Sequence, residues 1–118
     1  MQPNEAVAAL SALAHDHRLA VFRLLVERGP EGLCAGEIAD RLALAPSSLT
    51  FHTQALVRAG LVRQQRKSRR IIYSADFSGM NALVAFLTEK CCQEASDGVC
   101  AIECAPAAAA AKRKKRRA

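Results

Sequence analysis

The sequence predicts one small domain that is mainly α-helical and carries a single β-hairpin. Three observations support this fold class. The chain has 118 residues, the usual size of one domain. Its composition is 51% hydrophobic but only 4% aromatic, with no tryptophan, and it is rich in alanine and leucine, which favour helices. Two runs of strand-forming residues, 61–65 and 70–75, flank a short basic segment, a pattern typical of a hairpin.

Two helices are expected in the first quarter of the chain. Residues 5–14 form the first, with Asn4 as a candidate N-cap. Its apolar residues recur at spacings of three: Val7, Leu10 and Leu13. Asp16 can cap a second helix that continues to about residue 28, where Gly29 and Pro30 end it. The residues that this helix is expected to bury are Leu19, Phe22, Leu25 and Val26.

A third and a fourth helix follow, joined by a tight turn. The third is expected over residues 35–42, with Ile38, Ala39 and Leu42 directed inward. The turn LALAP ends at Pro46, which suits the first turn of a helix over residues 46–59 that Gly60 ends. The inward stripe of the fourth helix is Leu49, Thr53 and Leu56. Its outward stripe is Ser47, Thr50, Phe51, Gln54 and Arg58.

The hairpin and one more helix complete the predicted domain. The segments LVRQQ and RIIYSA pair on either side of RKSR, and a last helix runs from about residue 78 toward the pair Cys91 and Cys92. The apolar residues of that helix are Met80, Leu83, Val84 and Leu87. Residues 1–105 are therefore assigned to the domain. Residues 106–118 form an alanine-rich, basic tail of low complexity that is expected to be disordered.

The charge is distributed unevenly along the chain. The formal net charge is +6, but six of the 17 basic residues lie in the tail sequence KRKKRR, residues 112–117. No acidic residue occurs between Asp40 and Asp76, while seven basic residues fall there: Arg41, Arg58, Arg63, Arg66, Lys67, Arg69 and Arg70. This separation of charge, more than the sum, indicates a surface that binds phosphate groups.

Two short helices joined by a tight turn and followed by a basic hairpin form a winged helix-turn-helix, here in the order α-α-α-α-β-β-α. Three segments, ALAHDHRLAVFRLL, EIADRLALAPSSLTFHTQALVRAGLV and RRIIYS, resemble the ArsR/SmtB family of metal-responsive transcriptional repressors. The resemblance extends over about residues 5–92. It implies a homodimer that pairs through its first and last helices, binds an inverted-repeat operator and releases it when a metal or metalloid binds.

The resemblance also places the fourth helix in the major groove of DNA, and its short polar outward side chains suit that position. Gln54 is expected to pair with adenine, and Phe51 to contact a thymine methyl group. His52 lies beside the inward stripe and is predicted to be a core residue, whereas His15 and His17 are predicted to lie on the surface. The predicted DNA contacts are Ser47, Ser48, Thr50, Phe51, Gln54 and Arg58 on the helix and Arg66, Lys67, Arg69 and Arg70 on the wing.

The expected location is the bacterial cytoplasm, in association with the nucleoid. The sequence shows neither a secretory signal nor an apolar run of the roughly 20 residues that span a bilayer. Cysteines in that compartment stay reduced, so a cluster of them indicates a soft metal or a redox sensor rather than permanent disulfides. Four of the five cysteines fall within residues 89–104, EKCCQEASDGVCAIEC.

Two cysteine or histidine sites that the family uses are incomplete in this chain. The third helix contains GLCAGEIA, in which Cys34 is present but Gly36 and Ala39 occupy places that would need thiols. Residues 77–94 contain no histidine, which excludes a zinc site on the last helix. The remaining candidates are Cys91, Cys92 and Cys100, with Cys104 in reserve. Their spacing suits three-coordinate As(III) or Sb(III), and the arsenic-responsive branch of the family includes members with a C-terminal cysteine pair followed by a further cysteine.

Two other functions of this cysteine cluster remain open. Four thiolates in so short a segment could hold a tetrahedral zinc or cadmium ion. Alternatively, Cys91 or Cys92 could pair with Cys100 or Cys104 in a redox switch. An enzyme is not expected, because the sequence has no phosphate-binding glycine loop, no paired carboxylates and no cysteine–histidine arrangement. No catalytic residue and no catalytic cofactor are therefore assigned.

Overall fold

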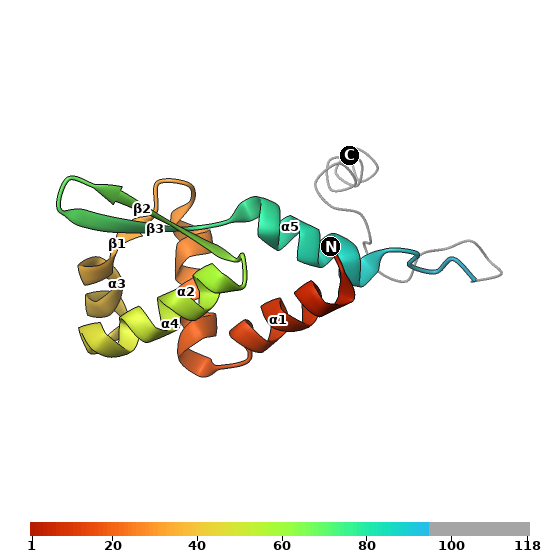
Figure 1. Ribbon diagram of the computed structural model, residues 1–118, viewed down its shortest axis with the longest axis horizontal. Helices are drawn as coiled ribbons and strands as arrows, with labels where there is room; N and C mark the ends of the chain where they lie inside the picture. The colour runs from red at the N-terminus through yellow and green to blue at the C-terminus, as the bar shows by residue number, and fades with distance from the viewer. Residues whose placement is uncertain (95–118) are drawn as a thin grey trace, which may run out of the picture.

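The computed structural model describes residues 1–94, and within them five helices and three short strands form a winged helix-turn-helix (Figure 1), which confirms the predicted fold class. The predicted domain boundary at residue 105 and the tail after it lie outside the described residues. The elements are α1 (Pro3–Leu13), α2 (Asp16–Arg28), β1 (Leu33–Cys34), α3 (Ala35–Leu42), α4 (Pro46–Arg58), β2 (Val62–Lys67), β3 (Arg70–Ala75) and α5 (Phe77–Thr88).

The first two helices begin one or two residues away from the predicted caps. Gln2, rather than Asn4, is the N-cap of α1, and Pro3 occupies the first helical position, where its fixed φ is already helical and it needs no N–H partner. His15, rather than Asp16, is the N-cap of α2. The acid then lies in the first turn of α2, where the helix dipole favours a negative charge.

The sheet has one more strand than the sequence predicts. The order is β1-β3-β2, all antiparallel, and the two residues of β1 pair with β3 so that Leu33 lies opposite Tyr73. In the predicted hairpin, Lys67 pairs with Arg70, which leaves a two-residue loop. Ser68 in this loop has a φ of 56°, a left-handed conformation that glycine adopts more readily, and the hairpin forms without glycine at its tip.

The core lies between α1, α2, α3, α4 and the inner face of the sheet. The inward stripe of α4 is confirmed, since Leu49, Thr53 and Leu56 are all buried. One prediction for α2 is wrong, because Leu19 is 44% exposed and Val21 lies in the core. At 100° per residue the buried face of α2 centres on Val21, Phe22 and Leu25, which leaves Leu19 on its flank.

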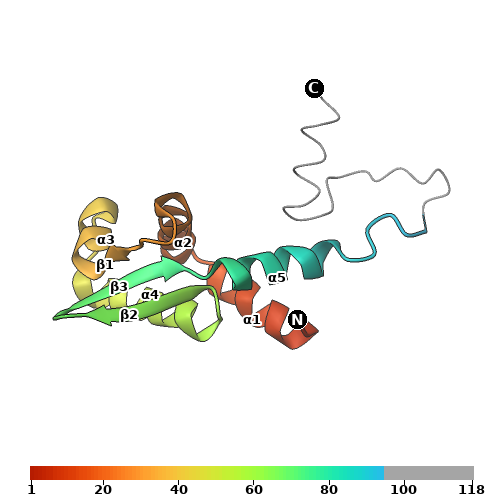
Figure 2. The same cartoon turned by 90° about the horizontal axis from the view of Figure 1, so that it is seen from above.

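The helices that begin and end the described chain lie at one end of the molecule, and the hairpin extends from the other (Figures 1 and 2). The apolar side chains exposed on α1 and α5 are Val7, Leu10, Val84 and Leu87. No helix in residues 1–94 combines the length and the apolar character that a bilayer crossing needs.

The start of α5 is fixed tightly to the turn that follows α4. Asp76 caps α5, since its carboxylate accepts hydrogen bonds from the Gly79 N–H at 3.0 Å and the Ser78 hydroxyl at 2.7 Å. The Gly79 bond is the larger cause that lowers the pKa of Asp76. The Asp76 N–H donates to the Leu61 carbonyl at 2.8 Å. A Cβ atom at position 79 would collide with the Gly60 carbonyl oxygen, so glycine is required there.

Candidate nucleic-acid interface

The outward face of α4 is built from short polar side chains around one aromatic ring. Ser47, Ser48, Thr50, Phe51 and Arg58 are all exposed, as the amphipathic pattern predicts. The Phe51 ring is 61% exposed, which is unusual because phenylalanine side chains are mostly buried. Small hydroxyls and a flat apolar ring are side chains that can approach base edges and thymine methyl groups closely.

Gln54 is placed differently from the rest of this face. It is half-buried, and its Nε2 donates to Oε1 of Gln64 on β2 at 2.8 Å. The amide therefore links α4 to the wing across their junction. Its Oε1 is not used in this hydrogen bond, so the side chain can still accept from a base while its donor side is held in place.

The wing residues Arg66, Lys67, Arg69 and Arg70 are exposed, as predicted. Arg70 is anchored, because its Nη2 donates a hydrogen bond to Sγ of Cys34 at 3.0 Å. This hydrogen bond is the main cause that raises the pKa of Arg70. Cys34 is also the N-cap residue of α3, and its N–H donates to Glu37 at 3.0 Å. Cys34 thus connects α3 to the wing.

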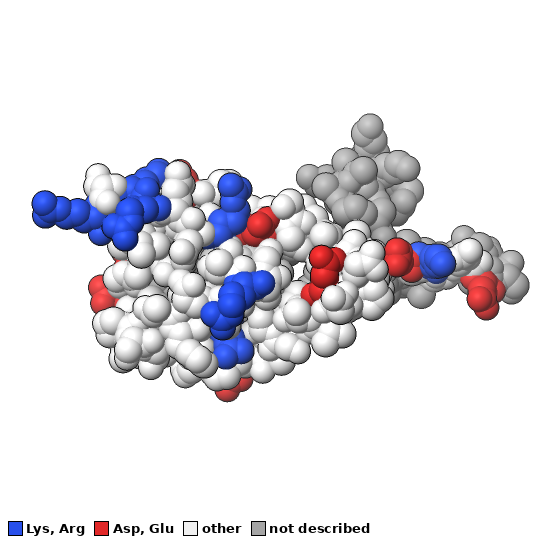
Figure 3. Space-filling view, viewed as in Figure 1, with Lys and Arg blue, Asp and Glu red and all other residues white. Residues whose placement is uncertain are grey.

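Basic residues gather on the side of the molecule that carries the hairpin and α4. Figure 3 shows blue groups at the hairpin end and again over the junction of α4 with α1 and α2, while red groups are scattered around the edges of this face and toward the end of α5. This follows from the sequence, because the 35 positions that build α4 and the hairpin contain no acid. The resulting positive field favours a polyanion.

Arg18 on α2 belongs to this surface, although sequence analysis did not select it. Its Cζ lies 5.5 Å from the centre of the Phe51 ring, within the range of a cation–π contact. The local pattern around Arg18 is that of an ordinary amphipathic helix, so no signal in the sequence marks it. Only the packing of α2 against α4 brings the two side chains together.

The predicted ligands Cys91 and Cys92 lie just beyond α5, which ends at Thr88 and does not continue to the pair. Lys90 and Cys92 both have left-handed backbone conformations, with φ of 61° and 58°. In a continuing helix, adjacent side chains would point about 100° apart. The turn instead brings the two sulfur atoms to 3.6 Å. Two sulfurs bound about 2.3 Å from one tetrahedral ion are roughly 3.8 Å apart, so the spacing suits a shared soft ion.

The other two candidate ligands, Cys100 and Cys104, lie outside the described residues. Within residues 1–94, no group of three or more histidine, cysteine or acidic side chains is arranged to hold a metal ion, so Cys34 does not join the pair. Partial burial, together with the hydrogen bond to Cys92, raises the pKa of the Cys91 thiol. At neutral pH this thiol is therefore held in its protonated form.

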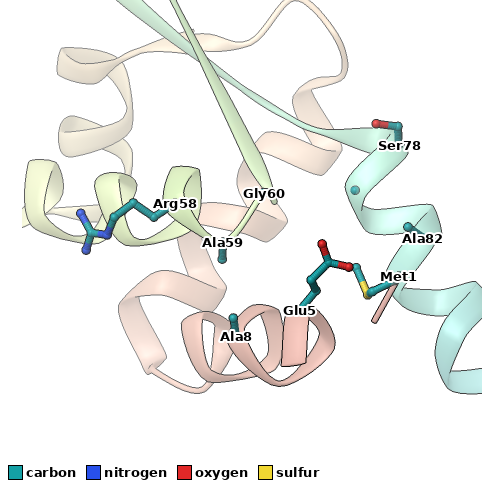
Figure 4. A pocket seen from close by; sticks show the side chains of 9 residues that line it. Met1, Glu5, Ala8, Arg58, Ala59, Gly60, Ser78 and Ala82 are labelled. Carbon is teal, nitrogen blue, oxygen red and sulfur yellow. The ribbon is translucent and has the colours of Figure 1, made fainter. Parts of the chain in front are cut away.

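A cavity of about 480 Å³ lies where α1, the end of α4 and the first turns of α5 meet (Figure 4). It is bounded by Arg58, Ala59 and Gly60 at the end of α4, by Met1, Glu5 and Ala8 at the start of the chain, and by Ser78, Gly79 and Ala82 on α5. Three elements that the sequence predicts to serve DNA contact and pairing therefore meet around one space.

Comparison with known proteins decides the family. A helix-turn-helix domain family matches residues 13–65. The HTH-type transcriptional regulator YgaV of Escherichia coli is 33% identical over 89 residues, which cover 75% of this chain and 88% of YgaV. The structure of HlyU from Vibrio cholerae is 30% identical, covers 79% of this chain and all of HlyU, and superposes with a TM-score of 0.61. An ArsR-like transcriptional regulator from Rhodococcus is 26% identical over 71% of this chain and 76% of its own, with a TM-score of 0.63. The chain belongs to the ArsR-type helix-turn-helix transcriptional regulators.

The ArsR-type assignment establishes the general activity. Like its relatives, the chain is a DNA-binding transcriptional regulator and not an enzyme. In this family member α3 and α4 form the helix-turn-helix and the β2–β3 hairpin forms the wing. The relatives do not determine the direction of regulation, since HlyU is named a transcriptional activator.

Proposed function

We propose that this ArsR-type regulator is a cytoplasmic repressor that binds operator DNA as a homodimer and releases it when As(III) or Sb(III) binds its C-terminal cysteines. The observation that carries the proposal is the 3.6 Å separation of the Cys91 and Cys92 sulfurs at the end of α5. Cys100 supplies the third thiol, with Cys104 as the alternative. Three thiolates satisfy a trivalent metalloid, which is soft and pyramidal.

The homodimer is supported by apolar surface that a monomer would leave in water. Val7, Leu10, Val84 and Leu87 are exposed by 43% to 61% on two helices at the same end of the molecule. Burying such a face against a second copy removes it from solvent. The α1–α5 face is then the dimer seam, and the cysteine pair lies at the end of that seam.

The protonation state of Cys91 favours a metalloid over an oxidant. Peroxide reacts with thiolates, and partial burial with the Cys92 hydrogen bond raises the pKa of Cys91, which slows the reaction of that sulfur with peroxide. Neutral arsenous acid, As(OH)₃, needs no thiolate beforehand. It exchanges three hydroxides for three thiols and releases three waters, so three As–S bonds replace three As–O bonds without a change in oxidation state or in the number of free protons.

Release of DNA follows if the bound ion changes the angle or the mobility between the two recognition helices of the dimer. Half-sites must be contacted simultaneously, about one helical turn of DNA apart. A coupling free energy of roughly 1–3 kcal/mol would lower operator affinity about 5- to 150-fold. Linkage then requires that operator-bound dimer holds the metalloid more weakly by the same factor.

The test is a titration of the operator complex, followed by fluorescence anisotropy, with arsenite, antimonite, zinc, cadmium and peroxide in turn. Arsenite or antimonite is expected to release the wild type under reducing conditions. The variants Cys91→Ser, Cys92→Ser and Cys100→Ser are expected to stay bound, and Cys34→Ser, the matched control, to respond as the wild type does. If Cys104→Ser stays bound while Cys100→Ser is released, Cys104 is the third ligand.

The same titration separates the two alternatives. Zinc or cadmium binding displaces a proton from each thiol, so release by these ions strengthens as pH rises, whereas exchange with arsenous acid releases none. Release by zinc or cadmium alone would replace the metalloid with a divalent ion. Release by peroxide alone would make the cluster a redox switch, a function that gains interest because a relative, HlyU, has been solved in a form described as reduced.

A further inference from the structure

All three histidines of the chain lie together beside the recognition helix. His15 and His17 come from the start of α2, and His52 from α4. The ring centres of His15 and His52 are 4.7 Å apart, those of His17 and His52 are 5.4 Å apart, and those of His15 and His17 are 5.6 Å apart. We call these residues, together with Arg18, the α2 cluster.

Two nitrogen atoms of the α2 cluster are enclosed without a hydrogen-bond partner. His52 is only 6% exposed, and its Nδ1 has none. The Nε of Arg18 is in the same condition. Among the described residues these are the two buried side-chain nitrogen or oxygen atoms without a partner. A buried polar group left unpaired costs about 1–3 kcal/mol, and the Nε of Arg18 can only donate, so this cluster favours a ligand that accepts hydrogen bonds.

The charges around the α2 cluster favour an anion. The start of the 13-residue helix α2 contributes the positive end of its dipole. Arg18 and Arg58 line a shallow cavity of about 330 Å³ whose remaining walls are Ser11 and alanines of α1 and α4. The acidic side chain in this turn is Asp16, which is exposed. Burial, followed by the charges of His15, Arg18 and His17, lowers the pKa of His52 and keeps that ring neutral at neutral pH.

The position of the α2 cluster identifies the anion. Arg18 lies over Phe51, so the α2 cluster borders the exposed face of α4 on one flank. On the other flank, the same face is bordered by β2, whose Gln64 is hydrogen-bonded to Gln54. A helix in the major groove has a row of backbone phosphates on each side. The hairpin lies on one side of α4 and the start of α2 on the other (Figure 1), so in a major-groove complex each would face a different row.

We propose that the α2 cluster is a second phosphate-contact site, which holds the DNA backbone on the α2 side of the recognition helix and binds more tightly when the cluster gains a proton. The proposal rests on DNA binding by α4. His15 Nδ1 accepts the N–H of His17 at 3.1 Å, so a proton there would break the cap of α2. The imidazole of His17 is exposed and is not the acceptor of this cap, so its charged form would add a donor beside Arg18 without disturbing the start of α2.

The test is the affinity for a random-sequence duplex, measured by anisotropy between pH 8.0 and pH 6.0 in phosphate-free buffer. The chain has no histidine outside the cluster, and loss of the change in the histidine variants separates it from titration of the terminal amino group. Wild-type affinity is expected to rise roughly 5- to 10-fold as pH falls, as expected for one added charge-assisted hydrogen bond. The salt dependence of log K should steepen by about 0.9 at pH 6.0, the value for one further phosphate.

The variants distinguish the site from a structural role. His17→Gln, and the double variant that adds His15→Asn to preserve the cap, should bind DNA at pH 8.0 nearly as the wild type does and lose the rise at pH 6.0. The matched control Arg69→Gln on the wing should weaken binding at every pH and keep the rise. A pH profile of His17→Gln equal to that of the wild type would overturn the proposal, and so would an unchanged salt slope.

Two further outcomes are informative. If inorganic phosphate without DNA raises the thermal midpoint of the wild type but not of His17→Gln, the site belongs to a free anion, and the DNA assignment is wrong. If the wild type binds no duplex at low salt at any pH, the proposed function itself fails, which is distinct from binding that lacks a pH dependence.

Discussion

At the scale of single residues, the hydrogen bond between Gln54 and Gln64 changes how DNA contact by α4 is understood. The sequence predicts Gln54 as a free base-contacting residue. The structure shows that its donor side is bonded to the wing strand at 2.8 Å. Gln64 is therefore a positioning residue, because it fixes the rotamer in which Gln54 meets a base and reduces the side-chain entropy lost on binding.

The Gln54 prediction compares three variants on a duplex selected from a random pool and on a random duplex. Gln54→Ala is expected to lower the ratio of the two affinities by about 10-fold, since a good bidentate contact with a base contributes about 1–3 kcal/mol of discrimination. Gln64→Ala should lower the ratio less, by roughly 2- to 3-fold, without changing the preferred base. Gln65→Ala, the neighbour on the opposite face of β2, should leave the ratio unchanged. Equal effects of Gln64→Ala and Gln65→Ala would refute the positioning role.

The degree of burial of the three histidines follows from the sequence, but their contact with one another does not. His52 was predicted to be buried because it borders the apolar stripe of α4, and it is. His15 and His17 were correctly predicted to be exposed. Their approach to His52, however, depends on how α2 crosses α4, and helical periodicity carries no information about a contact between distant elements. For the same reason, the sequence does not predict the contact of Arg18 with Phe51 or the hydrogen bond between Cys34 and Arg70.

At the scale of elements, the helices were predictable and the small connecting features were not. Apolar spacing, proline at the start of α4 and glycine after α2 define helices to within about two residues. The strand β1 has only two residues and exists because β3 lies beside it, so no local pattern marks it. The end of α5 at Thr88 was also missed, since the apolar stripe alone does not show where the helix stops.

The junction of α4, β2 and α5 gives a prediction at this scale. Gly79→Ala should lower the free energy of unfolding by about 1–3 kcal/mol, because the new methyl group meets the Gly60 carbonyl oxygen and forces the backbones apart. Gly36→Ala is the matched control: it lies in the first turn of α3, and its added Cβ has no neighbour within 4 Å. It should raise stability by about 0.5–1 kcal/mol through helix propensity. Urea denaturation measures both, and a Gly79→Ala variant as stable as the wild type would contradict the packing described.

At the scale of the whole molecule, the exposed apolar faces of α1 and α5 predict assembly. A stable interface buries about 800 Å² per partner. The exposed apolar side chains of α1 and α5 can form the centre of such an interface. Leu87→Glu should raise the dimer dissociation constant by roughly 100-fold or more, because two-fold symmetry introduces the carboxylate into the interface twice. Sedimentation velocity measures this change.

The control for Leu87→Glu is Leu19→Glu, which places the same charge on a leucine that is 44% exposed on α2, away from the proposed seam. It should remain dimeric. A wild type that is monomeric at micromolar concentration would refute the dimer, as would a Leu87→Glu variant that stays paired. Since both half-sites must be bound together, the monomeric variant should also lose operator affinity while it retains its fold.

The closure of the hairpin onto the start of α5 fixes how far a small movement is transmitted. Leu61 and Asp76, at the two ends of the hairpin, are joined by a 2.8 Å bond directly beside the contact between Gly60 and Gly79. The helix of 12 residues extends about 18 Å to one side of this fixed point, and each six-residue strand extends about 20 Å to the other. The two arms are nearly equal in length. A displacement of about 3 Å at the cysteine end would therefore rotate α5 by roughly 10° and, if the junction stays rigid, move the arginines at the wing tip by a similar distance.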